Sequence, residues 1–211
     1  AKGDYKRFFQ LIYEGGRYAY YLMFFIAFPV CLEADYILHL WLVEVPEYSV
    51  LFLRFVLCIS LFRMFSRSIL SGVHATGNVK TLNLTSGVYS AGTFLPAVYI
   101  AYKLDTPVWS CFVIQSFNLC ICTMFEVRAL YKQIHFNIAD YFIKVYAYSI
   151  GVSLVSIIPS VLLVWLVDPS FLRLILTLVI STISLSFCIY TIGINKDTRS
   201  KINKFVFNKI R

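Results

Sequence analysis

The sequence predicts an all-α fold: a polytopic transmembrane helix bundle with six spans, both termini in the cytoplasm, and a short amphipathic surface helix at each end. Three observations support this prediction. Of the 211 residues, 59% are hydrophobic and only 14% are charged, whereas soluble domains are nearer 45–50% apolar and about 25% charged. The apolar runs are long enough to cross a bilayer core, which takes about 20 residues. Finally, lysines and arginines are concentrated in every second segment that connects those runs.

The chain is expected to begin with a cytoplasmic amphipathic segment, residues 1–17. Tyr5, Phe8, Phe9 and Ile12 have the spacing of one helix face, with basic and polar residues between them. A helix of this kind lies in the membrane surface and leads into the first span. The opening residues do not form a signal peptide, and the chain is interpreted as a piece of a longer protein.

Six apolar runs follow, joined by short links. Residues 18–130 are expected to form four spans, and residues 131–194 a C-terminal two-helix hairpin. The predicted spans are 18–40, 49–72, 80–102, 108–130, 141–167 and 169–194. Proline removes a backbone hydrogen bond and bends a helix, so Pro29 in the first span and Pro96 in the third are predicted hinges.

The distribution of basic residues sets the orientation. Most of the 19 lysines and arginines fall at the two ends and in alternate links, while Lys103 and Arg173 fall on the opposite side. Cytoplasmic links carry the excess of Lys and Arg, so both ends are expected in the cytoplasm. Residues 195–211 form a basic cytoplasmic tail, predicted to be a surface helix attracted by anionic lipid at about 1 kcal/mol per base. Membrane topology therefore explains the net charge of +8 better than nucleic-acid binding does.

Small residues line one face of each of the last two spans at helical spacing. They are Ser149, Ser153, Ser156 and Ser160 on one span and Thr177, Ser181, Ser184 and Cys188 on the next. Small residues let helix backbones approach closely in lipid, which predicts a packed hairpin. A polar transport path is the alternative interpretation.

The second span carries three arginines inside an otherwise apolar run. Burying an arginine near the bilayer centre costs roughly 2.5–3.5 kcal/mol, so each one must face a wet cavity, an acid or an anionic ligand. At about 100° per residue, Arg63 and Arg67 lie on one helix face, about 40° apart. Arg54 is on the opposite face, near the outer end of the span.

Guanidinium groups grip phosphates through paired hydrogen bonds. Arg63, Arg67 and Arg54 are therefore the candidate substrate-binding residues of a central cavity. Structural pairing with acids or helix ends is the alternative. Three acids are the candidate ion-pair or coupling residues. Glu126 on the fourth span is the candidate partner of Arg63 and Arg67. Glu33 and Asp35, at the end of the first span, are the candidate partners of Arg54.

No catalytic apparatus is recognisable in the sequence. His39, His74 and His135 are scattered and lack metal-ligand spacing. Cys120 and Cys122 lack the two-residue spacer of a zinc site, and all six cysteines fall within predicted spans, where they are expected as small buried hydrophobes. We therefore expect no enzymatic activity, no metal and no cofactor.

Four short segments, taken in order, carry a resemblance. They are LWLVEVP at 40–46, FLR at 52–54, ATGNVK at 75–80, and Leu95-Pro96 with the short loop that follows. Their order and spacing, over about residues 4–130, resemble bacterial polysaccharide (O-antigen-type) flippases of the multidrug/oligosaccharidyl-lipid/polysaccharide exporter superfamily, which includes the MATE-like transporters. The last two spans are assigned by position only.

The resemblance implies a transporter of the bacterial inner membrane that moves polyprenyl-pyrophosphate-linked oligosaccharide to the outer leaflet by alternating access. Two helical lobes would surround a cationic cavity, with this chain supplying most of the second lobe and two C-terminal helices. Arg54 matches a position where the family often has arginine. Arg63 and Arg67 fall where the family has smaller polar or acidic residues, so their assignment rests on the physical argument.

The expected partners follow from the same resemblance. They are the lipid-linked oligosaccharide, membrane lipid, the N-terminal lobe of the same protein, and a polysaccharide polymerase or glycosyltransferases; nucleic acid is not among them. Three other functions stay open: a small-molecule (multidrug-type) exporter on the same fold, a membrane-embedded glycosyl- or acyltransferase, and a structural subunit of a polysaccharide assembly complex. A cavity lined by arginines would repel cationic drugs, and a transferase would need clustered acids or a histidine pair.

Overall fold

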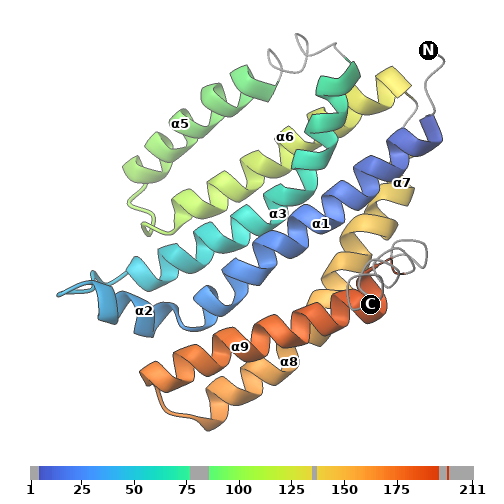
Figure 1. Ribbon diagram of the computed structural model, residues 1–211. Coiled ribbons are helices and arrows are strands. Elements are labelled where there is room, and N and C mark those ends of the chain that lie inside the picture. The colour runs from blue at the N-terminus through green and yellow to red at the C-terminus, as the bar shows by residue number, and fades with distance from the viewer. Residues whose placement is uncertain (1–4, 77–85, 135–136, 195–198, 200–211) are drawn as a thin grey trace. The chain divides into compact units, whose positions relative to one another are not determined.

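The computed structural model describes residues 5–76, 86–134, 137–194 and 199, and this part of the chain is helical without strands (Figure 1). The all-α class is therefore confirmed. The elements are α1 (Tyr5–Leu32), α2 (Ala34–Trp41), α3 (Ser49–Thr76), α5 (Val88–Lys103), α6 (Ser110–Ile134), α7 (Ile138–Tyr141), the π-helix η2 (Phe142–Ala147), α8 (Tyr148–Leu166), α9 (Phe171–Cys188) and the π-helix η3 (Ile189–Gly193).

Five helical stretches in the described residues are long and apolar enough to cross a membrane. They are Arg7–Leu32, Ser49–Ala75, Ser110–Ile134, Ile138–Leu166 and Phe171–Gly193. By length and composition the chain is thus a multi-pass membrane protein. The remaining predicted span, the third at 80–102, corresponds to α5, whose 16 residues reach about 24 Å, short of the roughly 30 Å hydrocarbon core. The start of that span and the tail helix predicted within 195–211 lie outside the described residues, and the cytoplasmic termini remain a prediction.

The N-terminal region differs from the prediction. Instead of a surface helix followed by a span over 18–40, α1 runs unbroken from Tyr5 to Leu32, and α2 begins after a break at Glu33. The backbone of Glu33, at φ −94° and ψ 16°, has left the α-helical region. Pro29 lies one turn before the break, but a proline ring crowds the turn that precedes it, and the Glu33 N–H still donates to the Pro29 carbonyl oxygen at 3.1 Å, so the proline does not explain the break. The helix bounds in this region therefore differ from those of the predicted first span.

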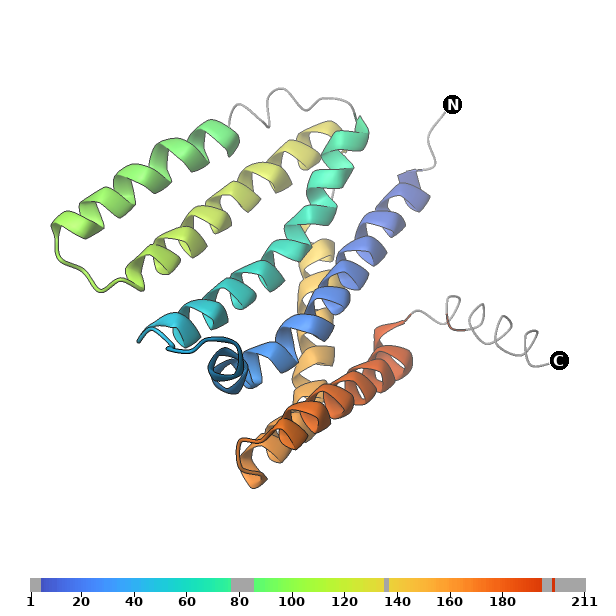
Figure 2. The ribbon, with the colours of Figure 1, turned by 60° about the vertical axis from the view of Figure 1, so that its left-hand side comes forward.

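The chain divides into two compact units, residues 1–146 and 147–211. In the first, α1 packs along α3, α3 along α6, and α6 along α5, as both ribbon views show (Figures 1 and 2). Between α5 and α6, the buried Asn118 side-chain amide donates to Thr93 Oγ1 at 2.7 Å. Interhelical hydrogen bonds of this kind help to hold helices together in lipid.

An aromatic cluster forms the centre of the first unit. We use this name for Tyr20, Phe65, Tyr141 and Tyr146. The Phe65 ring stacks on Tyr20 at 4.4 Å between centroids and lies 4.1 Å from the Tyr146 ring. The Tyr141 hydroxyl donates to the Phe65 carbonyl oxygen at 2.7 Å. The cluster therefore joins α1, α3 and the beginning of the fifth predicted span.

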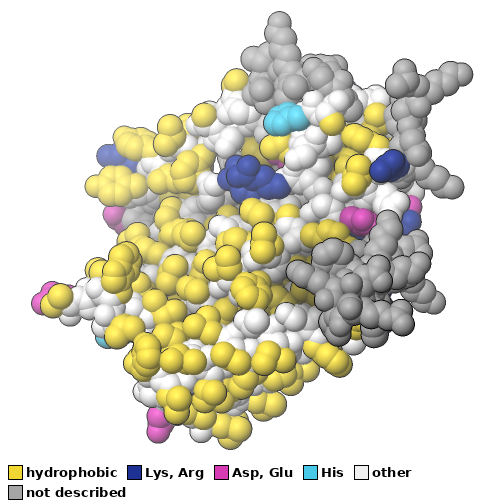
Figure 3. Space-filling view, in the orientation of Figure 1, with side chains coloured by type: hydrophobic (Ala, Val, Ile, Leu, Met, Phe, Trp, Pro, Cys, Tyr) yellow, Lys and Arg dark blue, Asp and Glu magenta, His cyan; other side chains and the backbone are white. Residues whose placement is uncertain are grey.

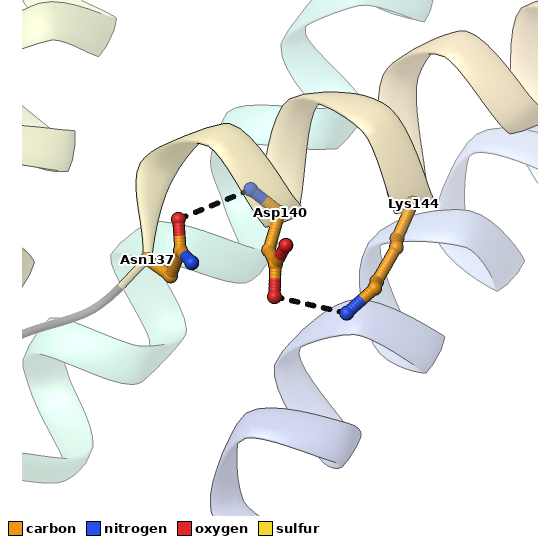
Figure 4. Close-up of polar contacts among 3 residues, drawn as sticks. All are labelled: Asn137, Asp140 and Lys144. Carbon is orange, nitrogen blue, oxygen red and sulfur yellow. Dashed lines mark hydrogen bonds and ion pairs between the residues drawn. The ribbon is translucent and has the colours of Figure 1, made fainter.

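The fifth helix begins earlier than residue 141, where the sequence pattern placed it. The side-chain oxygen of Asn137 accepts a hydrogen bond from the Asp140 backbone N–H at 3.2 Å, which caps the helix (Figure 4). One turn later, Lys144 Nζ lies 2.9 Å from Asp140 Oδ2. A side-chain oxygen at the N-cap satisfies a helix donor that would otherwise lack a partner. The sequence carries this signal, an asparagine followed three residues later by an acid.

Glycines allow the close approach of α1 to its neighbours. A Cβ added at Gly16 would lie 2.7 Å from the Tyr141 hydroxyl, whereas one added at Gly15 would make an ordinary contact of 3.4 Å with Ser68. On α3, a Cβ at Gly72 would meet the Ile12 side chain at 2.7 Å. Small residues at such crossings are typical of helix packing in lipid.

Substituting Gly16 by alanine is expected to lower the melting temperature of the purified protein in detergent. The new methyl group would push the Tyr141 hydroxyl from its bond to Phe65, and overpacking of this kind costs about 1–3 kcal/mol. Gly15→Ala is the matched control: it gains the helix propensity of alanine, up to about 1 kcal/mol, without a clash. Equal melting temperatures for the two variants would contradict the packing described here.

The second unit is a helical hairpin of α8 and α9. The small-residue stripes predicted from the sequence are buried in it, namely Ser149, Ser153, Ser156, Ser160, Thr177 and Ser181. Ser184 Oγ donates across the hairpin to the Ser156 carbonyl oxygen at 3.0 Å, in agreement with a packed hairpin. At the turn, Ser170 caps α9, and the buried Arg173 guanidinium donates to the Val167 carbonyl oxygen at 3.0 Å.

Candidate functional site

The predicted arginines lie along α3. Arg63 is at the middle of this helix, about 21 Å from its start at 1.5 Å per residue, and Arg67 is one turn further on. Both side chains are exposed in the structure. In the space-filling view, Lys and Arg side chains form a patch over the middle of α3 within a largely hydrophobic face (Figure 3). Two cationic groups are thus accessible at a depth where a bilayer would disfavour them.

Arg67 lines a cavity of about 340 Å³ between α1 and α3. The other lining residues include Phe8, Leu11 and Ala19 of α1 and Ser68 and Ser71 of α3. The two serine hydroxyls donate to helix carbonyl oxygens, Ser68 to Ile12 at 2.6 Å and Ser71 to Arg67 at 3.0 Å. Among the lining residues, the Arg67 guanidinium is therefore the charged group that could hold an anion.

Glu126 lies on α6, the helix that packs along α3. It lies close enough to Arg63 and Arg67 for both charges to act on it. However, no ion pair joins it to either arginine in the described part of the chain, and its buried Oε2 atom has no hydrogen-bond partner there. Glu126 is thus near both arginines, but the direct ion pair is not formed within the described residues, and the depth of these groups in a membrane stays a prediction.

Arg54 has a different environment. Its Nε donates to the Cys31 carbonyl oxygen at 3.2 Å, in the last turn of α1. Asp35, one of its predicted partners, instead lies 3.7 Å from the ring of His39, one turn along α2. Glu33, the other, is fully buried at the break between α1 and α2. The structure thus brings Arg54 to a helix end, as in the structural alternative, and its bond to a backbone carbonyl leaves no signal in the sequence.

The two predicted hinge prolines occupy unlike positions. Pro29 is fully buried one turn before α1 ends, and Pro96 is exposed inside α5. Each removes a hydrogen bond from its helix. Whether the helices bend there during a transport cycle remains a prediction.

Comparisons with protein-family models, with curated proteins and with solved structures give no match. The class of the protein therefore rests on its own fold and site. These define a helical multi-pass membrane protein with two exposed arginines at mid-span and a nearby, partly buried acid.

Proposed function

We propose that the chain is the C-terminal portion of a flippase in the bacterial inner membrane. It would translocate polyprenyl-pyrophosphate-linked oligosaccharide by alternating access, for the assembly of surface polysaccharide. The observation that carries the proposal is the pair of exposed guanidinium groups in the middle of α3, one of them lining a cavity. The order of the sequence segments that resemble the flippase family supports it further.

The physical argument begins with the cost of charge in a bilayer. An arginine at mid-span is roughly 2.5–3.5 kcal/mol unfavourable on insertion scales, and no ion pair offsets this cost for Arg63 or Arg67 within the described residues. A diphosphate would offset it, because it offers each guanidinium two oxygens in the matching geometry. In this mechanism Arg63 and Arg67 hold the diphosphate, while Arg54 joins α3 to α1.

Glu126 has a role of its own in this proposal. It lies near both arginines without touching them, so in its ionised form it would lower the cost of the two cations when no substrate is bound. An arriving diphosphate would compete with Glu126 for the same guanidinium groups. A change in the lobes that moves α6 relative to α3 would then alter the affinity for the anion, which alternating access requires.

A second function is favoured by one observation. The buried, unpartnered Oε2 atom of Glu126 is the type of group with which a multidrug-type exporter on the same fold would bind an amphipathic cation. The two proposals differ in the charge of the substrate. A membrane-embedded glycosyl- or acyltransferase is the alternative from another class, and turnover by the purified protein would identify it.

The proposal is tested in a strain that lacks the protein. We expect surface polysaccharide to disappear and the lipid-linked oligosaccharide to accumulate in the inner leaflet, and a plasmid copy of the gene to reverse both effects. Proteoliposomes should also move a fluorescent polyprenyl-pyrophosphate oligosaccharide faster than liposomes without protein. Normal surface polysaccharide in the deletion strain would refute the proposal. Loss of resistance to cationic drugs, with polysaccharide intact, would instead support the exporter.

A further inference from the structure

An apolar groove of about 920 Å³ runs along α6. Its floor and walls include Phe62 of α3, Met124 and Val127 of α6, and Phe142 and Tyr146 of η2. All the lining residues belong to the first compact unit. The volume falls within the range of small-molecule sites, roughly 300–1,000 Å³. The groove is separate from the cavity that Arg67 lines.

The charge in this groove lies at one end. Arg128 and Lys132, one turn apart in the last part of α6, line it together with Tyr131, and no acid is among the lining residues. Both bases are exposed, and no ion pair engages either of them in the described ranges. Tyrosine and basic side chains are typical of the headgroup depth of a membrane. The groove is therefore apolar along its length and cationic at the end formed by the last part of α6.

We propose that this groove binds an anionic phospholipid, with the headgroup phosphate between Arg128 and Lys132 and an acyl chain along Met124 and Phe142. A zwitterionic lipid would fill the apolar part equally well but would gain less from the two bases. A soluble anion would gain from the bases and leave the apolar walls uncovered. The occupant must combine both features, and an anionic lipid does so. The inference depends on the membrane location of the chain and not on the transport proposal.

The occupant is tested by quenching with brominated lipids. The full-length protein carries Phe142→Trp as a reporter at the groove, with Trp41, Trp109 and Trp165 replaced by phenylalanine. It is placed in phosphatidylcholine vesicles that contain increasing fractions of brominated phosphatidylglycerol or brominated phosphatidylcholine. We expect half-maximal quenching by phosphatidylglycerol at a roughly 10- to 30-fold lower mole fraction, because two bases near the membrane surface attract an anionic lipid.

Three variants distinguish binding in the groove from general attraction to the membrane surface. Arg128→Gln combined with Lys132→Gln should bring the two lipids to equal quenching, whereas Lys103→Gln, at the end of α5, should leave the preference intact. Thr123→Phe fills the groove while keeping both bases, and should lower the preference as well. Since Arg128 and Lys132 are exposed, their replacement is not expected to unfold the protein.

Three results would overturn the proposal. Equal quenching by the two lipids in the parent protein would remove the preference for an anion. A preference that survives the double substitution would place the anion elsewhere. Displacement of brominated phosphatidylglycerol by an equal fraction of unlabelled polyprenyl phosphate would assign the groove to a transported lipid instead of a phospholipid.

Discussion

Replacing either Arg63 or Arg67 by alanine in the complete protein is expected to abolish surface polysaccharide without lowering the amount of protein in the membrane. Each guanidinium would lose its hydrogen bonds to the diphosphate, which are worth about 1.5–3 kcal/mol each when charged groups take part, or roughly 10- to 150-fold in binding for every bond lost. Both side chains are exposed and unpaired within the described structure, so folding should tolerate the change. Polysaccharide staining and immunoblots of membranes measure the two quantities.

The controls separate charge from helix integrity. His74→Ala changes an exposed side chain on the same helix and should leave polysaccharide normal. Arg63→Lys keeps the charge but loses the paired geometry, and should retain part of the activity. Normal polysaccharide from both alanine variants would reject the assignment of these residues to the substrate.

The largest loss of stability is expected from Phe65→Ala. Phe65 is 0% exposed and its ring contacts Tyr20 and Tyr146. Removing a fully buried phenylalanine side chain typically costs 3–5 kcal/mol, so the free energy of unfolding should fall by about that amount. Thermal unfolding in detergent, followed by circular dichroism, measures the change.

Phe62→Ala is the matched control, because Phe62 is the same residue type on the same helix but is 55% exposed. Its replacement should change the free energy of unfolding by less than about 1 kcal/mol. Similar losses for the two variants would show that the aromatic cluster is not the centre of the first unit.

Much of the fold could be predicted from the sequence, because the apolar runs are long and the bilayer admits few alternatives. The small-residue stripes of the last two helices likewise indicated their packing, and Ser156 and Ser160 are buried as expected. The break at Glu33 was missed. Two acids, Glu33 and Asp35, mark this place in the sequence, but they were interpreted only as partners of Arg54 and not as a sign that the helix is interrupted.

The candidate site was predicted in part. The helical period predicted that Arg63 and Arg67 share one helix face. The position of Glu126 along its span predicted that it lies near them. The contact of Arg54 with the Cys31 carbonyl oxygen could not be predicted, because it depends on where α1 ends. The groove beside α6 was also missed, as it is formed by side chains from segments more than 70 residues apart in sequence.

In the proposed transport cycle, the separation between Glu126 and the two arginines would affect how fast the substrate anion binds. A tight internal carboxylate–guanidinium bond must dissociate before an incoming anion can replace it, which adds a barrier to every cycle. Here no such bond joins Glu126 to either arginine within the described residues. Capture of a diphosphate would then be governed by its arrival at the helix and not by the release of a resident ligand.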